Sequence, residues 1–233
     1  MPGYPFDLVI FDCDGVLVDS EPIANEVFSR MLKELGLEIG IDEMYAQFVG
    51  RSMADCMRLV EERLGYAPPP DFVTKLQERT FQAFEAGGLQ PTPGIEEVLD
   101  AIPVPVCVAS SGEVEKMRFT LGLTGLLPRF DGYLFSVTEV AHAKPAPDIY
   151  LYAAERMRAD SRRCAVIEDS LFGAQAGVAA GMTVFGYSAH TDAQALRRVG
   201  AHQTFAAMRE LPRLLERADV RAARNGASRL ERS

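Results

Sequence analysis

The stretch Leu8-Val9-Ile10-Phe11-Asp12-Cys13-Asp14-Gly15-Val16 decides the fold of this chain. Its short apolar run, which ends at a glycine turn, predicts a buried strand of a parallel sheet. Asp12 and Asp14 then stand at the carboxyl end of the strand, where open α/β sheets bind ligands. Two close carboxylates repel each other unless a cation bridges them, so the pair indicates a metal site. An Asp beside a divalent metal can attack phosphorus. Alternatively, one Asp caps the next helix and the other faces solvent.

Composition and charge narrow the class of protein. The 233 residues carry a net charge of −9, which argues against a nucleic-acid partner, because phosphate contacts need a basic surface. No apolar stretch approaches the about 20 residues that span a bilayer. The start Met1-Pro2-Gly3-Tyr4 lacks the features of a signal peptide, so we expect a cytoplasmic protein without a membrane partner.

The four cysteines do not form a recognisable framework. None of them has C-x-x-C spacing, and none lies near a histidine in a zinc pattern. We therefore expect reduced, buried thiols. Cys13 lies between two carboxylates, which disfavour a thiolate, so it is not a candidate nucleophile.

Strand-like and helical segments alternate along most of the chain. Alternation of this kind predicts a doubly wound α/β fold, with a parallel sheet and helices on both faces. The predicted strands are Leu8–Phe11, Val104–Ala109, Tyr133–Phe135, Cys164–Ile167, Thr183–Phe185 and, more weakly, Gln203–Phe205. The predicted helices between the later strands are Glu113–Leu121, Asp148–Met157 and Gly173–Ala180.

Residues 20–88 interrupt this alternation with helical periodicity alone. Helices are predicted over Glu21–Leu35, Met53–Leu64 and Phe72–Phe84, with hinges at Asp19–Pro22 and Gly87–Gly94. We expect a separate α-helical cap over residues 20–88, inserted into an α/β core of residues 1–19 and 89–233. Such an insert would form a lid over the first strand's carboxyl end; the alternative is a helical hairpin without a function.

The tail after Leu215 is rich in arginine and small residues. We expect a final helix that frays into a mobile end. A nucleic-acid-binding arm is the alternative, but the interleaved acidic residues Glu216, Asp219 and Glu231 disfavour it.

Polar side chains also follow three later strands. Ser110-Ser111-Gly112 can form an anion cradle, although Ser110 could instead cap a helix. Lys144 stands beside two prolines that hold its backbone, and Glu168-Asp169 is a second acidic pair of the kind that suits Mg²⁺. Because the carboxyl ends of parallel strands share one edge, we expect all these groups to meet.

The motifs Asp12-x-Asp14-Gly15-Val16-Leu17, Ser110, Lys144-Pro145 and Glu168-Asp169-Ser170, in that order, resemble those of the haloacid dehalogenase superfamily. The stretch Asp12–Glu21 is similar to the branch with an α-helical cap, which includes beta-phosphoglucomutase and sugar-phosphate phosphatases. The resemblance spans roughly Phe6 to Tyr187 and implies a monomeric enzyme with a small phosphate ester as substrate.

The resemblance also implies residue roles. Asp12 would attack phosphorus and become an aspartyl-phosphate. Asp14 would protonate the leaving alcohol and then deprotonate water. Ser110 would hydrogen-bond a phosphoryl oxygen, and Lys144 would neutralise charge near Asp12.

A Mg²⁺ cofactor is implied as well. Its ligands would be the Asp12 carboxylate, the Asp14 backbone carbonyl and Asp169, with Glu168 binding directly or through water. The second Asp of the first motif excludes the dehalogenase branch, which lacks it.

Two positions favour a phosphatase over a mutase. Where beta-phosphoglucomutases have a cap His and a Lys beyond the second motif, this chain has Ala24 and Glu113. Its second motif region and Gly173–Gly177 are similar to bacterial phosphatases that act on phosphorylated sugar acids such as 6-phosphogluconate. A mutase stays the alternative, a non-catalytic binding protein is a remoter one, and a phospho-acceptor receiver domain is disfavoured by length.

Substrate contacts are predicted from both parts of the chain. Ser111 and Gly112 would meet the phosphate. Arg51 could reach an anionic or hydroxyl-rich substrate, although a surface cation at a helix start is the alternative. Glu21, Asn25 and Lys116 are weaker candidates.

Overall fold

The chain folds into two compact units in a computed structural model that describes residues 4–40, 43–44, 47–48 and 53–218. One unit contains Met1–Asp19 and Pro91–Ser233, and the other contains Ser20–Gln90. We call them the core unit and the helical unit. The helical unit is inserted directly after the predicted Asp12–Asp14 motif.

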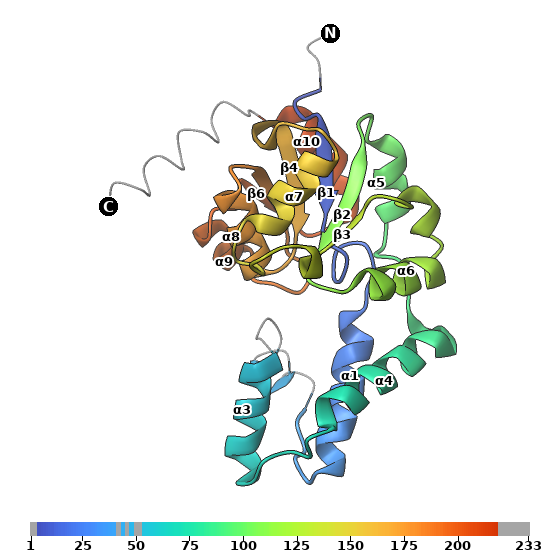
Figure 1. Ribbon diagram of the computed structural model, residues 1–233, viewed down its shortest axis with the longest axis vertical. Helices are drawn as coiled ribbons and strands as arrows, with labels where there is room; N and C mark the ends of the chain where they lie inside the picture. Colours follow the sequence, from blue (N-terminus) through green and yellow to red (C-terminus); the bar gives the residue numbers. More distant parts are fainter. Residues whose placement is uncertain (1–3, 41–42, 45–46, 49–52, 219–233) are drawn as a thin grey trace, which may run out of the picture. The chain divides into compact units, whose positions relative to one another are not determined.

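The core unit is built on a six-stranded parallel sheet with the order β3-β2-β1-β4-β5-β6 (Figure 1). This confirms the predicted doubly wound α/β fold. Phe11 pairs with Val108 on one side and with Ile167 on the other, so the strands β1, β2 and β4 end at the same level. The strands are β1 (Leu8–Phe11), β2 (Val106–Ser110), β3 (Leu134–Ser136), β4 (Cys164–Glu168), β5 (Thr183–Tyr187) and β6 (Gln203–Phe205).

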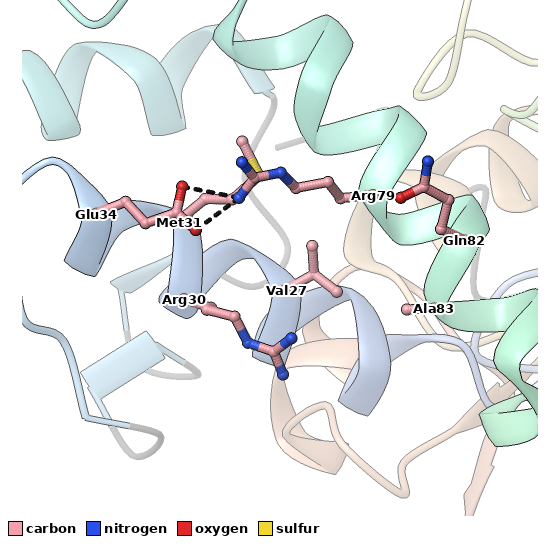
Figure 2. A pocket seen from close by; sticks show the side chains of 7 residues that line it. All are labelled: Val27, Arg30, Met31, Glu34, Arg79, Gln82 and Ala83. Atoms are coloured by element: carbon pink, nitrogen blue, oxygen red, sulfur yellow. Dashed lines mark hydrogen bonds and ion pairs between the residues drawn. The ribbon is translucent and has the colours of Figure 1, made fainter.

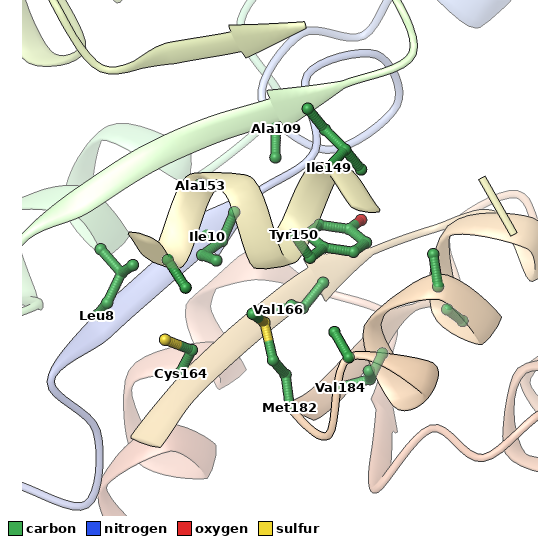
Figure 3. Packing of buried hydrophobic residues seen from close by; sticks show 14 of the residues in the cluster. Leu8, Ile10, Ala109, Ile149, Tyr150, Ala153, Cys164, Val166, Met182 and Val184 are labelled. Atoms are coloured by element: carbon green, nitrogen blue, oxygen red, sulfur yellow. The ribbon is translucent and has the colours of Figure 1, made fainter. Parts of the chain in front are cut away.

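Helices pack on the sheet through alternating side chains. Leu8 and Ile10 of β1 belong to a buried cluster with Tyr150 and Ala153 of α7 (Asp148–Arg156), which Figure 3 shows from close by. The same cluster includes residues of α8 (Leu171–Ala179) and α9 (Ala193–Arg198). On the opposite face of β1, the ring of Phe11 meets that of Phe130 at 6.4 Å between centroids.

Three further α-helices belong to the described part of the core unit: α5 (Ile95–Ala101), α6 (Val114–Leu123) and α10 (Leu211–Arg217) (Figure 1). The helices α5 and α9 are absent from the predicted elements. The predicted final helix lay after Leu215, but α10 begins at Leu211 and ends at Arg217, and the rest of the tail lies outside the described residues.

The helical unit has its own apolar core between α1 (Glu21–Glu34), α3 (Met53–Leu64) and α4 (Phe72–Ala83). Phe28 is central, since its ring lies 5.4 Å from that of Phe48 and 6.3 Å from that of Phe72. The segment Phe84–Gly88 (η1) follows α4, and Gly87 within it has φ +93°. Because apolar side chains recur on one stripe of each helix, these helices were predictable within one residue.

Two points of local structure correct or narrow the expectations. Ser20 stands at the N-cap of α1, so neither Asp12 nor Asp14 caps the helix that follows. No described helix combines the length and the apolar character that crossing a membrane requires.

Candidate active site

The loop after β1 is a tight turn whose backbone lies close to the Asp169 side chain. Within it, the Leu17 amide donates to the Cys13 carbonyl (2.9 Å) and the Gly15 amide to Val18 (2.9 Å). Gly15 has φ +76°, and a Cβ at this position would lie 2.2 Å from Asp169 Oδ2. Only glycine therefore allows both this backbone conformation and this close approach.

Lys144 connects the first and fourth predicted motifs. Its Nζ donates to Asp12 Oδ1 (2.6 Å), to Glu168 Oε1 (2.8 Å) and to the Ala109 carbonyl (3.2 Å). Its side chain is only 5% exposed. The Lys144–Pro145 peptide bond is cis. The structure thus brings Asp12, Lys144 and Glu168 together at one sheet edge, as expected for the ends of parallel strands.

The charge balance around Asp12 suits a divalent cation. Burial raises the pKa of Asp12 to about 7; Lys144 opposes this rise, while Glu168 and Asp14 add to it. One ammonium therefore leaves an excess of buried negative charge when Asp12 and Glu168 are both ionised.

The available oxygens also fit Mg²⁺. The Asp12 and Asp169 carboxylates and the Asp14 carbonyl are hard oxygen donors, and Mg²⁺ usually binds one or two carboxylates and keeps several waters. Across the described part of the chain, no three His, Cys, Asp or Glu side chains gather as a ready-made metal cluster.

Both carboxylate oxygens of Glu168 accept hydrogen bonds. Its Oε1 accepts from Lys144 and from the hydroxyl of Tyr150 (3.0 Å), and its Oε2 accepts from the Ser170 amide (2.8 Å) and hydroxyl (2.9 Å). Gly173 lies against it, since a Cβ there would be 1.6 Å from Oε1. Glu168 is 1% exposed, so these contacts set the direction of a buried carboxylate.

Ser110 is buried at the end of β2. Its Oγ accepts from the Gly112 amide (3.1 Å), and the Gly112 carbonyl accepts from the hydroxyl of Ser136 (2.8 Å). The N-cap of the following helix α6 is Glu113, so the alternative of Ser110 as a helix cap is wrong. Ser110 therefore shapes the turn that holds Ser111 and Gly112.

Lys116, a weak candidate in the sequence, pairs with Asp14. Its Nζ lies 2.6 Å from Asp14 Oδ2. Burial lowers the pKa of Lys116, but the charge and hydrogen bond of Asp14 outweigh it, and the net shift is upward. The ammonium thus stays charged beside Asp14.

Two functional contacts were missed in the sequence. Tyr150 lies under Lys144, whose Nζ is 4.9 Å from the ring centroid, and Ser136 supports the Ser110 turn. Tyr150 sits on the buried stripe of α7, where a core aromatic gives the same pattern. Ser136 is the last residue of β3, and its only signal was a polar residue next to the predicted strand Tyr133–Phe135.

The predicted residues of the helical unit do not gather in a described site. Glu21 and Asn25 lie half-buried on the first turns of α1, and Arg51 lies outside the described residues. A cavity of about 460 Å³ does lie between α1 and α4 (Figure 2), but there Arg79 pairs with Glu34 (2.6 Å) and Arg30 with Glu26 (2.7 Å). The cavity is lined by Val27, Arg30, Met31, Glu34, Arg79, Gln82 and Ala83.

The fold and the site together define a class of hydrolase. This class has a parallel α/β core with an inserted helical unit, and an Asp, a Ser, a Lys and a second acidic residue at one edge of the sheet. Residues 6–181 match the family model of the haloacid dehalogenase-like hydrolases, and the chain belongs to this family. The resemblance seen in the sequence is therefore confirmed.

Among curated proteins, the chain is similar to 6-phosphogluconate phosphatase of Escherichia coli, with 31% identity across 78% of this chain and 83% of the relative. Among solved structures, it is similar to a haloacid dehalogenase-like protein of Agrobacterium tumefaciens, with 33% identity, a TM-score of 0.84 and coverage of 90% and 97% of the two chains. A family hydrolase of Deinococcus radiodurans with bound phosphate and sodium shares 33% identity, with a TM-score of 0.77 and coverage of 97% and 98%.

Proposed function

We propose that this chain is a Mg²⁺-dependent phosphatase that hydrolyses a small sugar phosphate or phosphorylated sugar acid through an aspartyl-phosphate on Asp12. The observation that carries the proposal is that each aspartate of the first motif contacts its own lysine. Lys144 Nζ lies 2.6 Å from Asp12 Oδ1, and Lys116 Nζ lies 2.6 Å from Asp14 Oδ2. The broader class, a phosphoric monoester hydrolase, agrees with the family and with the Escherichia coli relative.

The two aspartates have separate tasks in this reaction. An Asp12 carboxylate oxygen forms a bond to phosphorus while the bond from phosphorus to the leaving oxygen breaks. Asp14 gives its proton to that oxygen, and the alcohol departs. In the second half, Asp14 takes a proton from water and the water oxygen bonds to phosphorus while the bond from phosphorus to the Asp12 oxygen breaks, which releases inorganic phosphate and restores the Asp12 carboxylate.

The remaining residues of the site would stabilise the negative charge of the phosphoryl group and orient it. Lys144 faces the oxygens around Asp12, and the Ser110 turn presents the hydroxyl and amides that would receive the phosphoryl group. Mg²⁺, held by Asp12, the Asp14 carbonyl and Asp169 with Glu168 direct or through water, would supply positive charge to the phosphoryl oxygens.

We assign the choice of substrate and acceptor to the helical unit, acting as the cap. Both ends of this insertion meet in the core unit, where Val18 bridges Pro91. Ala24 and Glu113 replace the His and Lys that a mutase of this family would carry, which favours water as the acceptor. A cytoplasmic location and a monomeric state stay predictions.

Release of inorganic phosphate from a panel of sugar phosphates and p-nitrophenyl phosphate tests the proposal. We expect hydrolysis with Mg²⁺, none in EDTA, and none for Asp12→Asn. Asp131→Asn, at a surface ion pair with Arg118, is the matched control and should keep full activity. Inertness across the panel with Mg²⁺ would refute the phosphatase. Conversion of beta-glucose 1-phosphate into glucose 6-phosphate without phosphate release would instead favour the mutase.

A further inference from the structure

The ion pair of Lys116 and Asp14 joins two distant segments of the core unit. The residues are 102 apart in the sequence, yet Nζ and Oδ2 are 2.6 Å apart. Their side chains are 35% and 30% exposed, so the pair stands at the boundary between the interior and solvent. A partly exposed ion pair adds little to the free energy of unfolding. We therefore ask how this pair affects the orientation of the Asp14 carboxylate.

Helix α6 is anchored to the same loop at a second point. Thr120, one turn after Lys116 and fully buried, has its Oγ1 3.9 Å from Cys13 Sγ, and Met117 is 1% exposed. The Thr120 hydroxyl also lies within hydrogen-bond distance of the Lys116 carbonyl, at 3.1 Å. Because residues four apart share one helix face, the two contacts fix α6 along the Cys13–Asp14 backbone. The helix that carries the Lys116 ammonium is therefore held in place next to Asp14.

The two lysines of the site serve different aspartates. Lys144 contacts Asp12 and Glu168, whereas Lys116 contacts Asp14. Gly112 leaves room next to the second pair, since a Cβ there would lie 3.4 Å from Lys116 Cδ and 4.0 Å from Asp14 Oδ2. Each of the two aspartate carboxylates is therefore contacted by a different lysine.

We propose that Lys116 is a positioning residue that sets the direction of the Asp14 carboxylate for proton transfer to the leaving oxygen. The inference rests on the proposed phosphatase reaction and goes beyond it. In that step the Asp14 proton moves to the oxygen whose bond to phosphorus breaks, and the Asp14 carboxylate stays behind. Lys116 exchanges no proton and forms no bond. It keeps the carboxyl group within reach of the leaving oxygen.

The leaving group separates this role from plain phosphate binding. A sugar alkoxide is a poor leaving group and needs the proton, whereas p-nitrophenolate is stable and leaves without it. Loss of correct direction at Asp14 therefore slows the formation of the aspartyl-phosphate selectively for sugar phosphates, whereas the later attack of water, which Asp14 also assists, is the same step for both substrates. Loss of a phosphate-binding cation would instead weaken the binding of both substrates alike.

The experiment compares Lys116→Met with wild type on p-nitrophenyl phosphate and on the sugar phosphate that wild type hydrolyses fastest. Methionine keeps an unbranched stem without the charge. We expect kcat/KM, which reports the formation of the aspartyl-phosphate, to fall about 100-fold on the sugar phosphate and less than about threefold on p-nitrophenyl phosphate. Lys116→Arg should restore part of the loss. Lys75→Met, at the surface pair with Asp71, is the control and should change neither rate.

Each alternative outcome is distinguishable. Equal losses of kcat/KM on both substrates would overturn the positioning role. An inactive wild type would refute the proposed function itself and not the ion pair. If circular dichroism shows that Lys116→Met is unfolded, the same comparison of the two substrates is made with Lys116→Gln, and its result decides between the two roles.

Discussion

Gly173→Ala gives the sharpest test of the site's geometry. Gly173 lies in α8, where helix propensity alone favours alanine by about 1 kcal/mol. The structure predicts the opposite sign, because the new Cβ would lie 1.6 Å from Glu168 Oε1 and 2.0 Å from its Cδ, well inside the 3.0 Å limit for such contacts. Glu168 must therefore leave its place.

The loss can be estimated from the hydrogen bonds of Glu168. Its Oε1 accepts from Lys144 and Tyr150, and bonds to charged groups are worth about 1.5–3 kcal/mol each. Losing both costs about 3–6 kcal/mol, and the helix gain returns about 1 kcal/mol. We expect the free energy of unfolding to fall by about 2–5 kcal/mol, and phosphatase activity to be lost with it.

Urea unfolding followed by circular dichroism measures the change, since the chain has no tryptophan. Gly122→Ala is the matched control, because Gly122 also lies in a helix, α6, and its nearest contact would be Leu127 Cδ2 at 4.0 Å. It should stabilise by up to about 1 kcal/mol. If both variants shift the midpoint upward, the close approach of Gly173 to Glu168 is wrong.

Three further predictions follow from buried charges and protons. Lys144→Met should abolish phosphate release and lower the free energy of unfolding in EDTA by about 3–5 kcal/mol, because Asp12 and Glu168 stay buried without their cation; an unchanged urea midpoint would contradict this. Burial raises the pKa of Cys164 to about 12, and all four cysteines are buried, so a thiol reagent at pH 8 should label none rapidly in the native protein and four in urea; fast native labelling would be the contrary result. Burial, and then Glu216, raises the pKa of Tyr4 from 10.0 to about 12 in the folded state, so unfolding becomes easier as pH rises through this range, and Tyr4→Phe should lose less stability there than wild type; parallel losses would disprove it.

The strands were predictable because a sheet covered on both faces leaves apolar runs in the sequence. The run of β1 matches the strand at both ends, whereas the prediction for β5 stopped at Phe185 and the strand continues to Tyr187. Gly186 explains the difference. In sequence a glycine suggests the end of a strand, but here a Cβ would lie 3.2 Å from Leu196 Cβ, so close packing by α9 favours glycine at this position.

Short helices escaped the sequence because they lack a sustained period. Helix α5 has seven residues and α9 has six, which is less than two turns. One local signal was present for α9, since the Asp192 side chain accepts from the amides of Gln194 and Ala195. A capping Asp before a short apolar segment would have located it.

The candidate site was predictable as a set of strand ends but not as a set of pairs. Parallel topology brings Asp12 and Lys144 to one edge without any knowledge of side chains. Which lysine faces which aspartate depends on helix register, and a single turn decides that Lys116 reaches Asp14. Tyr150 is an ordinary core position until the Glu168 carboxylate is seen beside its hydroxyl.

The bridge between Val18 and Pro91, together with the Thr92 amide donating to the Leu17 carbonyl at 3.0 Å, closes the core unit at the point where the helical unit leaves and returns. The insertion therefore begins and ends at neighbouring points of a finished fold. Loop-closure entropy depends only weakly on what lies between such ends. Evolution can accordingly exchange, lengthen or shorten the insertion as a module while the sheet edge that carries Asp12 and Lys144 keeps its geometry.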